Sequence, residues 1–263
     1  MLSLRWMRSM ARASSCATEQ ISSFSMFCET GTVSVNSGPG RGTQVRLVLP
    51  QPGSPDMVFT ANAGLVTRRR FLVSRFRYPE RQYEEPYFAD WFLDRGYDVF
   101  HTPRDVPFEG AGDALLDRGT RRLWFAHGQR SVAAARAFIA RHYDGELVCL
   151  RLTDERFYHL DTCFCPLDRG YLLYYPPAFD APSRKIIEDK VPARRRIEVA
   201  DEDALAFACN AVALGNRVIV NRASGALCAR LARLGFEVIQ TPLSEFMKAG
   251  GSAKCLTLRL DEP

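Results

Sequence analysis

The sequence predicts a mixed α/β fold built from similar repeats, and three observations lead to this prediction. Apolar, strand-like runs begin at Phe71, Leu123, Tyr171 and Arg217, at intervals of 46 to 52 residues. Each run is followed by a helix-like stretch and then by a second strand-like run. Each repeat ends in a polar break that leads into a third short strand. Self-similarity at a nearly constant spacing is typical of repeat architectures, so we expect similar strand–helix–strand repeats arranged in a ring.

The individual elements follow from the spacing of apolar residues. The opening runs read FLVSRF, LWFAHG, YLLYYP and RVIVNR, and we expect a strand in each. The expected helices cover residues 79–96, 131–145, 181–191 and 223–235. The second and fourth of these carry apolar residues at i, i+3 and i+4 and have a glycine at their end. The expected returning strands cover residues 97–103, 146–152, 195–200 and 236–242.

The composition is that of a globular protein without a signal for membranes or nucleic acids. The 263 residues fit one large domain or two small ones, with 46% hydrophobic and 25% charged residues. No run of about 18 apolar residues occurs, so we expect no transmembrane helix and no membrane partner. The net charge of +5 comes from scattered arginines, not from a basic stripe on one helix face. We therefore expect no nucleic acid as a partner.

The eight cysteines favour reduced thiols over a metal site. No CxxC pair occurs, and the close pair Cys163 and Cys165 lacks the second ligand pair or nearby histidines that zinc requires. No secretory signal peptide is recognisable, so we expect mostly buried, reduced thiols in a cytoplasmic protein. We expect neither a metal nor another cofactor.

Residues 1–50 form an atypical N-terminal segment, which we expect to be partly disordered. The first twenty residues contain no acid before Glu19 and are rich in Arg and Ser, as in an organelle transit peptide, although an unstructured start is the interpretation we favour. Residues 29–50 hold two alternating runs around a glycine turn, which predicts a β-hairpin. This hairpin resembles the closing hairpin of histidine-kinase ATPase domains, but no other part of an ATP site accompanies it. The repeats then occupy residues 51–263.

The polar breaks carry residue types suited to catalysis at equivalent places in the repeats. The breaks cover residues 54–66, 106–116, 156–167, 203–214 and 248–258. Their polar or reactive residues are Asp56 and Asn62, Glu109 and Asp113, His159 and Asp161, Asn210, and Cys255. Five similar repeats in a ring bring these positions to one centre, where glycines let backbones approach closely. We expect Cys255 at the start of a final strand, Asn210 in a structural role, and Asp113 either in a turn cap or in the site.

The stretches PDMVFTANAG, FEGAGD, FYHLD and GGSAKC, taken as an ordered set, resemble the guanidino-group-modifying superfamily over about residues 54–263. This superfamily includes arginine deiminases, dimethylargininases, arginine dihydrolases and amidinotransferases. The resemblance implies a five-bladed α/β propeller (pentein) of ββαβ units. The usual strand–helix–strand before PDMVF is missing here, which predicts an incomplete first blade and, with it, an exposed sheet edge.

The resemblance also implies roles for individual residues. Cys255 matches the nucleophile, His159 the general acid/base, and Glu109 a catalytic carboxylate that holds the substrate guanidinium. Asp161 and Asp56 match further carboxylates at the guanidinium, and Arg81 and Arg130 match arginines that receive the substrate α-carboxylate. Asn62 stands where dimethylargininases tend to carry an acid and dihydrolase-like relatives carry Asn.

The expected chemistry is hydrolysis of the guanidino group of arginine or an N-methylated arginine. A guanidinium leaves water readily only when carboxylates pair with it, and a thiolate is the nucleophilic form of cysteine. A covalent thiouronium on Cys255 would then be hydrolysed to citrulline, with release of ammonia or an amine. Three alternatives stay open, namely a dihydrolase that gives ornithine, an amidinotransferase, and a catalytically impaired guanidino-binding protein. The expected partner is this small guanidino substrate, and a homodimer is left open.

Overall fold

The computed structural model describes residues 32–35, 43–46, 48 and 51–262. The chain divides into two compact units, Met1–Val58 and Phe59–Pro263, which are described separately. In the first, β1 (Thr32–Val35) pairs with β2 (Thr43–Arg46) as an antiparallel hairpin, and a short 3-10 turn, η1 (Pro55–Val58), follows. The interpretation of the first twenty residues as a transit peptide or an unstructured start falls outside the described residues.

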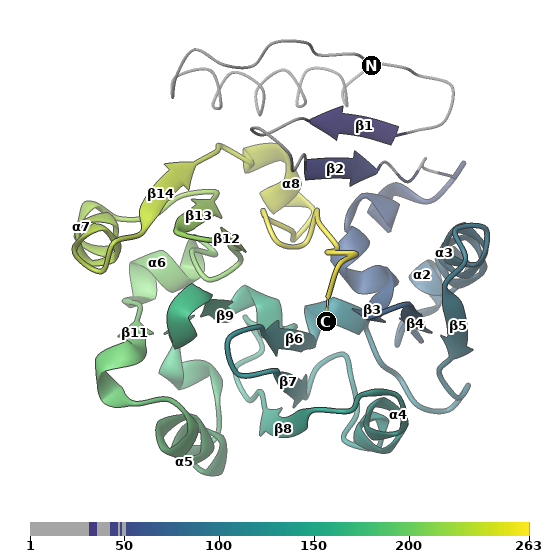
Figure 1. Ribbon diagram of the computed structural model, residues 1–263, viewed down its shortest axis with the longest axis horizontal. Coiled ribbons are helices and arrows are strands. Elements are labelled where there is room, and N and C mark those ends of the chain that lie inside the picture. The colour runs from purple at the N-terminus through teal and green to yellow at the C-terminus, as the bar shows by residue number, and fades with distance from the viewer. Residues whose placement is uncertain (1–31, 36–42, 47, 49–50, 263) are drawn as a thin grey trace. The chain divides into compact units, whose positions relative to one another are not determined.

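The second unit contains four three-stranded sheets with one shared topology (Figure 1). In each sheet the first strand is antiparallel to the second, and the second is parallel to the third. The first sheet consists of β3 (Gly64–Thr67), β4 (Arg70–Val73) and β5 (Asp98–His101), and the second of β6 (Ala114–Asp117), β7 (Arg122–His127) and β8 (Glu146–Arg151). The third consists of β9 (Phe164–Leu167), β10 (Tyr171–Tyr174) and β11 (Arg196–Glu198), and the fourth of β12 (Val212–Leu214), β13 (Arg217–Val220) and β14 (Glu237–Gln240).

A helical segment connects the second strand of each sheet to the third, because two parallel strands require a crossover. These segments are α2 (Pro79–Gln82) with α3 (Glu84–Leu93), α4 (Ala135–His142), α5 (Ala181–Lys190) and α7 (Gly225–Arg233). Two of these helices, α5 and α7, begin at a side-chain N-cap, because the side chains of Asp180 and Ser224 accept hydrogen bonds from backbone N–H groups of the first turn. Figure 1 shows the helices on the outer side of their sheets. Two shorter helices, α6 (Asp201–Leu205) and α8 (Ser244–Lys248), run into the start of the last two polar breaks.

Neighbouring sheets share apolar cores. One cluster joins the second, third and fourth sheets and includes Trp124, Phe164 and Val218. Within it the Trp124 ring meets Phe164 edge to face, with 5.1 Å between centroids. A second cluster joins the first two sheets through residues such as Leu72 and Phe125. The sheets therefore pack through their faces, which leaves the turns at their ends to form the site.

The predicted strand–helix–strand repeats are confirmed, since the strands expected from Phe71, Leu123, Tyr171 and Arg217 are β4, β7, β10 and β13. The final strand expected at Cys255 was wrong. Cys255 lies in a turn over residues 253–256, and the described residues after it form no strand. The backbone groups of Cys255 are used otherwise, because its N–H donates to Asn210 Oδ1 at 3.2 Å and its C=O accepts from Ala61 N–H at 3.1 Å.

Candidate active site

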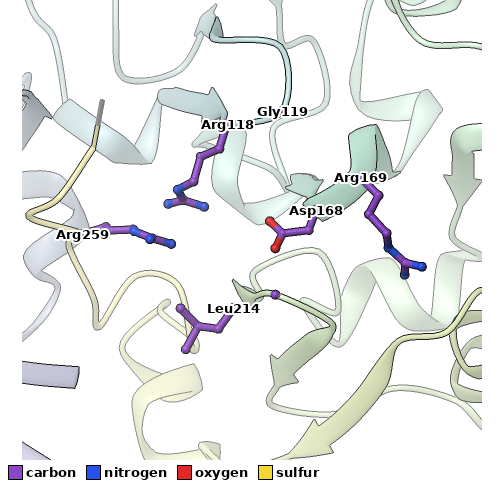
Figure 2. A pocket seen from close by; sticks show the side chains of 7 residues that line it. Arg118, Gly119, Asp168, Arg169, Leu214 and Arg259 are labelled. Carbon is purple, nitrogen blue, oxygen red and sulfur yellow. The ribbon is translucent and has the colours of Figure 1, made fainter. Parts of the chain in front are cut away.

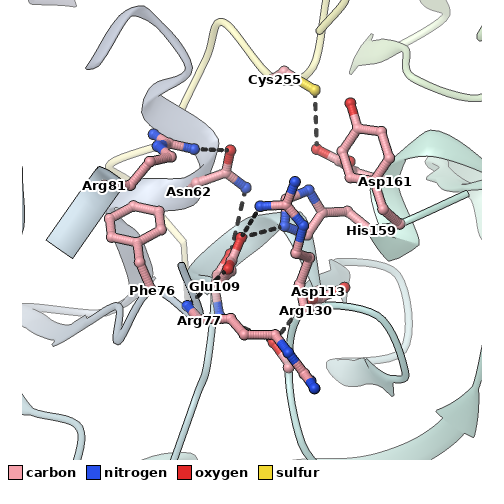
Figure 3. A network of polar contacts seen from close by, with 12 residues as sticks. Asn62, Phe76, Arg77, Arg81, Glu109, Asp113, Arg130, His159, Asp161 and Cys255 are labelled. Atoms are coloured by element: carbon pink, nitrogen blue, oxygen red, sulfur yellow. Dashed lines mark hydrogen bonds and ion pairs between the residues drawn. The ribbon is translucent and has the colours of Figure 1, made fainter. Parts of the chain in front are cut away.

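Three equivalent turns place the candidate residues. Each is a short 3-10 turn just before the first strand of a sheet: η2 (Thr60–Ala63), η3 (Gly110–Gly112) and η4 (Leu160–Thr162). Asn62 lies in η2, Glu109 directly before η3, His159 directly before η4, and Asp161 within η4. All four side chains belong to residues that are at most 3% exposed, and Figure 3 shows them together with Cys255. The topology shared by the sheets therefore brings polar residues from breaks far apart in the sequence into one buried cluster.

Glu109 and His159 form the centre of one half of this cluster, the histidine side. His159 Nε2 lies 2.7 Å from Glu109 Oε2. Glu109 Oε1 accepts from the backbone N–H of Arg77 at 3.1 Å. Burial alone would raise the pKa of Glu109, but His159, the Arg130 guanidinium and the Arg77 N–H together hold that pKa below its usual value. The carboxylate is therefore ionised and available for a cation.

His159 is surrounded by carboxylates. Burial alone would lower the pKa of its imidazolium, but the charges of Asp113, Glu109 and Asp161 raise that pKa above its ordinary value. These carboxylates thus favour the protonated ring over the neutral one, and a protonated imidazole can serve as a general acid.

Asp113 links the two segments that carry Glu109 and His159. Its Oδ1 accepts from Leu160 N–H at 3.0 Å, and its Oδ2 accepts from the Ser131 hydroxyl at 2.6 Å. Ser131 Oγ in turn accepts from Glu109 N–H at 3.0 Å. Burial raises the pKa of Asp113 to about 6. Asp113 thus acts both as a turn cap and as a support for the site.

Cys255, Asp161 and Asn210 form the other half, the cysteine side. Cys255 is 3% exposed, and its Sγ lies 3.1 Å from Asn210 Nδ2 and 3.7 Å from Asp161 Oδ2. Burial and the Asp161 carboxylate raise the pKa of the Cys255 thiol far above its usual value. The thiol is thus protonated in this environment, and only an added positive charge or a lost negative one would release its proton.

Two buried polar atoms beside the thiol have no hydrogen-bond partner among the described residues. They are Asp161 Oδ1 and Ser252 Oγ. Burial raises the pKa of Asp161, and His159 and Lys254 act in the opposite direction. A buried carboxylate oxygen without a partner is costly, and it is suited to accept an N–H of a bound ligand.

Arg81 contributes to the site through Asn62. Arg81 Nη1 donates to Asn62 Oδ1 at 3.1 Å, and its Nη2 pairs with Glu84 Oε2 at 2.8 Å. Its guanidinium also lies 4.3 Å from the centroid of the Phe76 ring. Because the amide oxygen of Asn62 is held by Arg81, the Nδ2 group points towards the backbone oxygen of Glu109, at 3.5 Å.

Arg130 reaches Glu109 from the more exposed side. Its Nη1 is 3.5 Å from Glu109 Oε2, and a quarter of its side-chain surface is accessible. Its guanidinium lies 4.8 Å and 5.2 Å from the ring centroids of Tyr78 and Tyr158. This places a cation between two aromatic rings at the edge of the cluster, within reach of a ligand anion.

Asp56 lies in η1, which belongs to the first unit. Its proposed place at the guanidinium stays a prediction. The other predicted residues, Cys255, His159, Glu109, Asp161, Asn62, Arg81 and Arg130, all lie in the second unit and are connected by the contacts given above.

Sequence reasoning did not find Glu84, Ser131 or Tyr158. Glu84 is fully buried and follows Arg81 by one helical turn, so the i, i+3 spacing was the signal available. Tyr158 precedes His159, and its hydroxyl donates to the backbone oxygen of Gly250 in the cysteine segment. Ser131 had no signal, because only the tertiary contact with Asp113 shows its part.

The two glycines of FEGAGD lie where neighbouring segments come too close to the backbone for a side chain to fit. A Cβ on Gly112 would lie 2.3 Å from Asn62 Nδ2 and 3.3 Å from the His159 ring. Gly110 has φ +58, and a Cβ there would lie 2.7 Å from the Gly64 backbone. These two positions let η2 and η4 approach η3.

Among the described residues, no group of three or more His, Cys, Asp and Glu side chains could hold a metal ion. In the same residues, no helix has the length and apolar character to cross a membrane.

A separate cavity of about 490 Å³ lies at the turns between the first two strands of three sheets (Figure 2). It is lined by Arg118, Gly119, Asp168, Arg169, Leu214, Gly215 and Arg259. Arg118 Nε already donates to Glu262 at 2.9 Å, and Arg169 Nη2 to the Leu234 backbone oxygen at 2.9 Å. None of its lining residues belongs to the histidine side or the cysteine side of the site, so we assign this cavity no role in the chemistry.

The fold agrees with comparisons to known proteins. A family model described as N,N dimethylarginine dimethylhydrolase, eukaryotic, matches residues 39–261. The chain belongs to this dimethylarginine dimethylhydrolase family, which confirms the resemblance to the guanidino-group-modifying superfamily.

Individual relatives refine this placement. The bifunctional arginine dihydrolase/ornithine cyclodeaminase AgrE of Nostoc sp. is 58% identical over 219 residues, which is 83% of this chain and 31% of AgrE. The chain thus spans about a third of that relative's length. The N(G),N(G)-dimethylarginine dimethylaminohydrolase of Mycobacterium tuberculosis is 40% identical over 219 residues, 83% of this chain and 70% of the relative.

Solved structures show the same fold. The N-terminal domain of the cyanobacterial arginine dihydrolase ArgZ, as a cysteine-to-serine mutant bound to substrate, aligns with a TM-score of 0.80 and 57% identity. The alignment covers 81% of this chain and 79% of that domain. A dimethylarginine dimethylaminohydrolase, as a histidine-to-glycine adduct with S-methyl-L-thiocitrulline, aligns with a TM-score of 0.67 and 25% identity over 80% of this chain and 79% of that one.

Proposed function

We propose that the chain hydrolyses the guanidino group of arginine through a covalent thiouronium on Cys255. The observation that carries this proposal is the buried set of a thiol, an imidazole and two carboxylates around one point. Glu109 and Asp161 supply acceptors for guanidinium N–H groups, and Asp161 Oδ1 has no other partner among the described residues. A guanidinium is a cation, so its arrival would lower the pKa of the Cys255 thiol and favour the thiolate.

The proposed steps balance as follows. Binding of the cation releases the Cys255 thiol proton to water, and the thiolate Sγ forms a bond to the guanidino carbon. A C–N bond of that carbon breaks as His159 passes a proton to the departing amine. His159, now neutral, takes a proton from water, whose oxygen attacks the thiouronium carbon. The S–C bond then breaks, and the proton of the new hydroxyl passes to sulfur, which gives citrulline and returns the thiol. Ammonia leaves from arginine, and methylamines would leave from methylated arginines.

A dihydrolase is the second candidate, and two observations favour it for this chain. The arginine dihydrolases AgrE and ArgZ are each 58% identical to it, against 40% for the mycobacterial dimethylaminohydrolase. Asn62 is also buried in the site with its amide oriented by Arg81. A second round on the ureido group would convert citrulline and water to ornithine, carbon dioxide and ammonia.

The solved ArgZ structures give this candidate a specific support. One is an asparagine-to-serine variant covalently bound to a reaction intermediate, and another is the cysteine-to-serine variant bound to substrate. The two substituted positions are separated by the same number of residues as Asn62 and Cys255. We infer that Asn62 and Cys255 occupy the corresponding places.

The α-carboxylate of the amino acid is assigned to Arg130, with Arg81 as the further arginine. Arg130 is partly exposed and lies beside Glu109, so its cation can reach a carboxylate at the edge of the site. Arg81 is engaged with Glu84 and Asn62, so its larger effect is expected on the orientation of Asn62. Asp56 is assigned to the guanidinium end as a further carboxylate.

The proposal extends to the whole chain. We propose that residues 51–263 form a five-bladed propeller with an incomplete first blade, and that residues 1–50 are an atypical segment outside it. The described part of the second unit supports four of these blades as sheets. We propose a cytoplasmic enzyme with a small guanidino substrate and without cofactor, metal, nucleic-acid or membrane partners, with a homodimer left open.

The test is product analysis. Purified protein is incubated with arginine, and separately with asymmetric dimethylarginine, and citrulline, ornithine, ammonia and dimethylamine are followed by mass spectrometry. Cys255→Ser serves as the control, and an added amine acceptor tests for amidino transfer. Ornithine from arginine supports the dihydrolase, and citrulline alone supports single hydrolysis. Folded protein that yields no product in any of these assays contradicts catalysis and leaves a guanidino-binding protein.

A further inference from the structure

Asn210 is a fully buried residue that contacts both the candidate nucleophile and Asp161. It lies between α6 and β12, just before the first strand of the fourth sheet. Its Oδ1 accepts from Lys254 N–H at 2.9 Å and from Cys255 N–H at 3.2 Å. The expectation from sequence gave it a structural role, and these two bonds do hold the cysteine turn to the fourth sheet.

The same two bonds determine which way the amide faces. Backbone N–H groups only donate, so the atom that both of them reach must be the amide oxygen. The NH₂ group therefore occupies the other position, where it lies 3.1 Å from Cys255 Sγ and 3.1 Å from the backbone oxygen of Asp161. Both of its hydrogens have an acceptor, and one of those acceptors is the sulfur.

We propose that Asn210 is a catalytic residue whose Nδ2–H stabilises the thiolate form of Cys255. The proposal rests on the function proposed above for Cys255 and adds a residue to its chemistry. A hydrogen bond to a charged acceptor is about twice as strong as one to a neutral acceptor, so a fixed N–H donor favours S⁻ over SH. The donor is set in place before substrate arrives, because the backbone of the cysteine turn holds the amide from its other end.

The surroundings of the thiol make such a donor necessary. The Asp161 carboxylate lies at 3.7 Å and opposes a second negative charge, as does burial. The Tyr158 hydroxyl is also close, and Lys254 is the nearby cation, with its Nζ directed at the backbone oxygens of Ala111 and Thr257. The backbone N–H contact within the Ser252 turn, the Asn210 amide and Lys254 are the groups that lower the pKa of the Cys255 thiol.

The first experiment measures the thiol itself and needs no turnover. The full chain is alkylated with iodoacetamide from about pH 6 to about pH 10, a range that brackets ordinary thiol titration. The rate at Cys255 is read by mass spectrometry from the tryptic peptide that spans residues 255–259, in which Cys255 is the only cysteine. The variants are Asn210→Ala and Asn210→Asp, and the latter keeps the acceptor for the two backbone N–H groups but replaces the donor with an anion.

Asn221→Asp is the matched control, because Asn221 Oδ1 also accepts a loop N–H, that of Leu243 at 2.8 Å, without touching a cysteine. Because the pKa of this thiol lies above the range, the thiolate fraction is read from the alkylation rate at each pH. The expected result is a rate about tenfold lower at each pH in Asn210→Ala, equivalent to a thiol pKa about one unit higher. A larger decrease is expected in Asn210→Asp, and none in Asn221→Asp. Unchanged rates in both folded Asn210 variants would overturn the proposal.

A second measurement keeps the proposal testable if the Asn210 variants do not fold. The chain has five asparagines, so their side-chain amides can be assigned by NMR after selective ¹⁵N labelling. The chemical shift of the Asn210 amide should differ between the unsubstituted chain and Cys255→Ser, because its acceptor changes from sulfur to oxygen. A signal that is the same in both chains at every pH contradicts the contact. Thiol titration that depends on Asn210 in a protein without hydrolytic activity would support this inference and defeat the proposed function.

Discussion

The cysteine side and the histidine side of the site differ in how charge surrounds their reactive groups. On the cysteine side, burial and the facing carboxylate of Asp161 raise the pKa of Cys255, so the proton stays on sulfur. On the histidine side, carboxylates face the imidazole and outweigh burial, so the pKa of His159 is raised and the protonated ring is favoured. The same kind of neighbour thus favours the neutral form of one group and the charged form of the other.

This difference explains how the free site can hold an unreactive, protonated thiol beside an imidazole that readily carries a proton. On the histidine side, the surrounding carboxylates favour the ring form that carries a proton for a leaving amine. On the cysteine side, Lys254 is the nearby cation, but its Nζ is directed at two backbone oxygens, so a bound cationic substrate would add positive charge beside the sulfur. The two halves are joined at Asp161, whose charge influences both pKa values.

The largest effect is expected from His159→Asn. Loss of the acid should lower kcat about 10²- to 10⁴-fold, because proton transfer to the amine and from water both use this ring. The rate of arginine consumption measures it, and the alkylation profile of Cys255 is the companion readout. A kcat within about tenfold of the unsubstituted enzyme would show that the histidine side does not carry the proton.

Asp161→Asn should separate the two halves. Without the carboxylate, the pKa of the Cys255 thiol should fall and alkylation at a given pH should become faster. Guanidinium binding should weaken at the same time, raising KM about tenfold or more, because a charged acceptor is lost. Unfolding would also expose the thiol and weaken binding, so the control is a thermal unfolding transition that matches that of the unsubstituted chain. Slower alkylation in folded protein would contradict the opposition between Asp161 and the thiol.

Asp113→Asn should affect the histidine side alone. The pKa of His159 should fall without this charge, so the high-pH limb of the kcat/KM profile should move to lower pH. Asp203→Asn is the matched control, since Asp203 accepts from Ser224 N–H at 2.6 Å and from its hydroxyl at 2.8 Å, away from the site. The same shift in both variants would assign the effect to general stability.

Asp113 also predicts a pH dependence of folding. Its pKa is raised from 3.8 to about 6, so its contribution to stability is full below the unfolded value and is lost as pH rises through the folded one. Across that window the free energy of unfolding should fall by about 3 kcal/mol from this group. Urea unfolding at a series of pH values measures this, and Asp113→Asn should remove that part of the slope.

The smallest effect is expected from Ser131→Ala. Glu109 N–H would lose its acceptor and Asp113 its hydroxyl donor, which should lower stability by about 1–3 kcal/mol. The Glu109–His159 contact itself is untouched, so kcat should fall only a few-fold, as read by steady-state rates beside thermal unfolding. A loss of activity as large as that of His159→Asn would mean that Ser131 holds the pair in place.

Both sides of the site also show which features could be predicted from the sequence. His159, Asp161 and Glu109 stood out because polar residues interrupt apolar runs at equivalent places in the repeats, and the structure brings these residues together. The repeats themselves were predictable from spacing, because side chains alternate along a strand and recur at i+3 and i+4 on a helix face. Cys255 was misplaced in a strand, because the apolar run after it resembles one while its backbone groups bond to Asn210 and Ala61.

The sequence by itself determined the order of the strands and helices, the repeat, and the residue types available for chemistry. These depend on neighbours a few residues apart, whose side chains alternate or recur with fixed periods. Only the tertiary structure decided that Arg81 orients Asn62, that Asp113 and Ser131 hold Glu109 to the His159 segment, and that the Asn210 amide turns its N–H groups to sulfur. Each of these contacts joins residues that are brought together by the packing of the sheets. The direction of each side chain therefore depends on which backbone groups the packing places beside it.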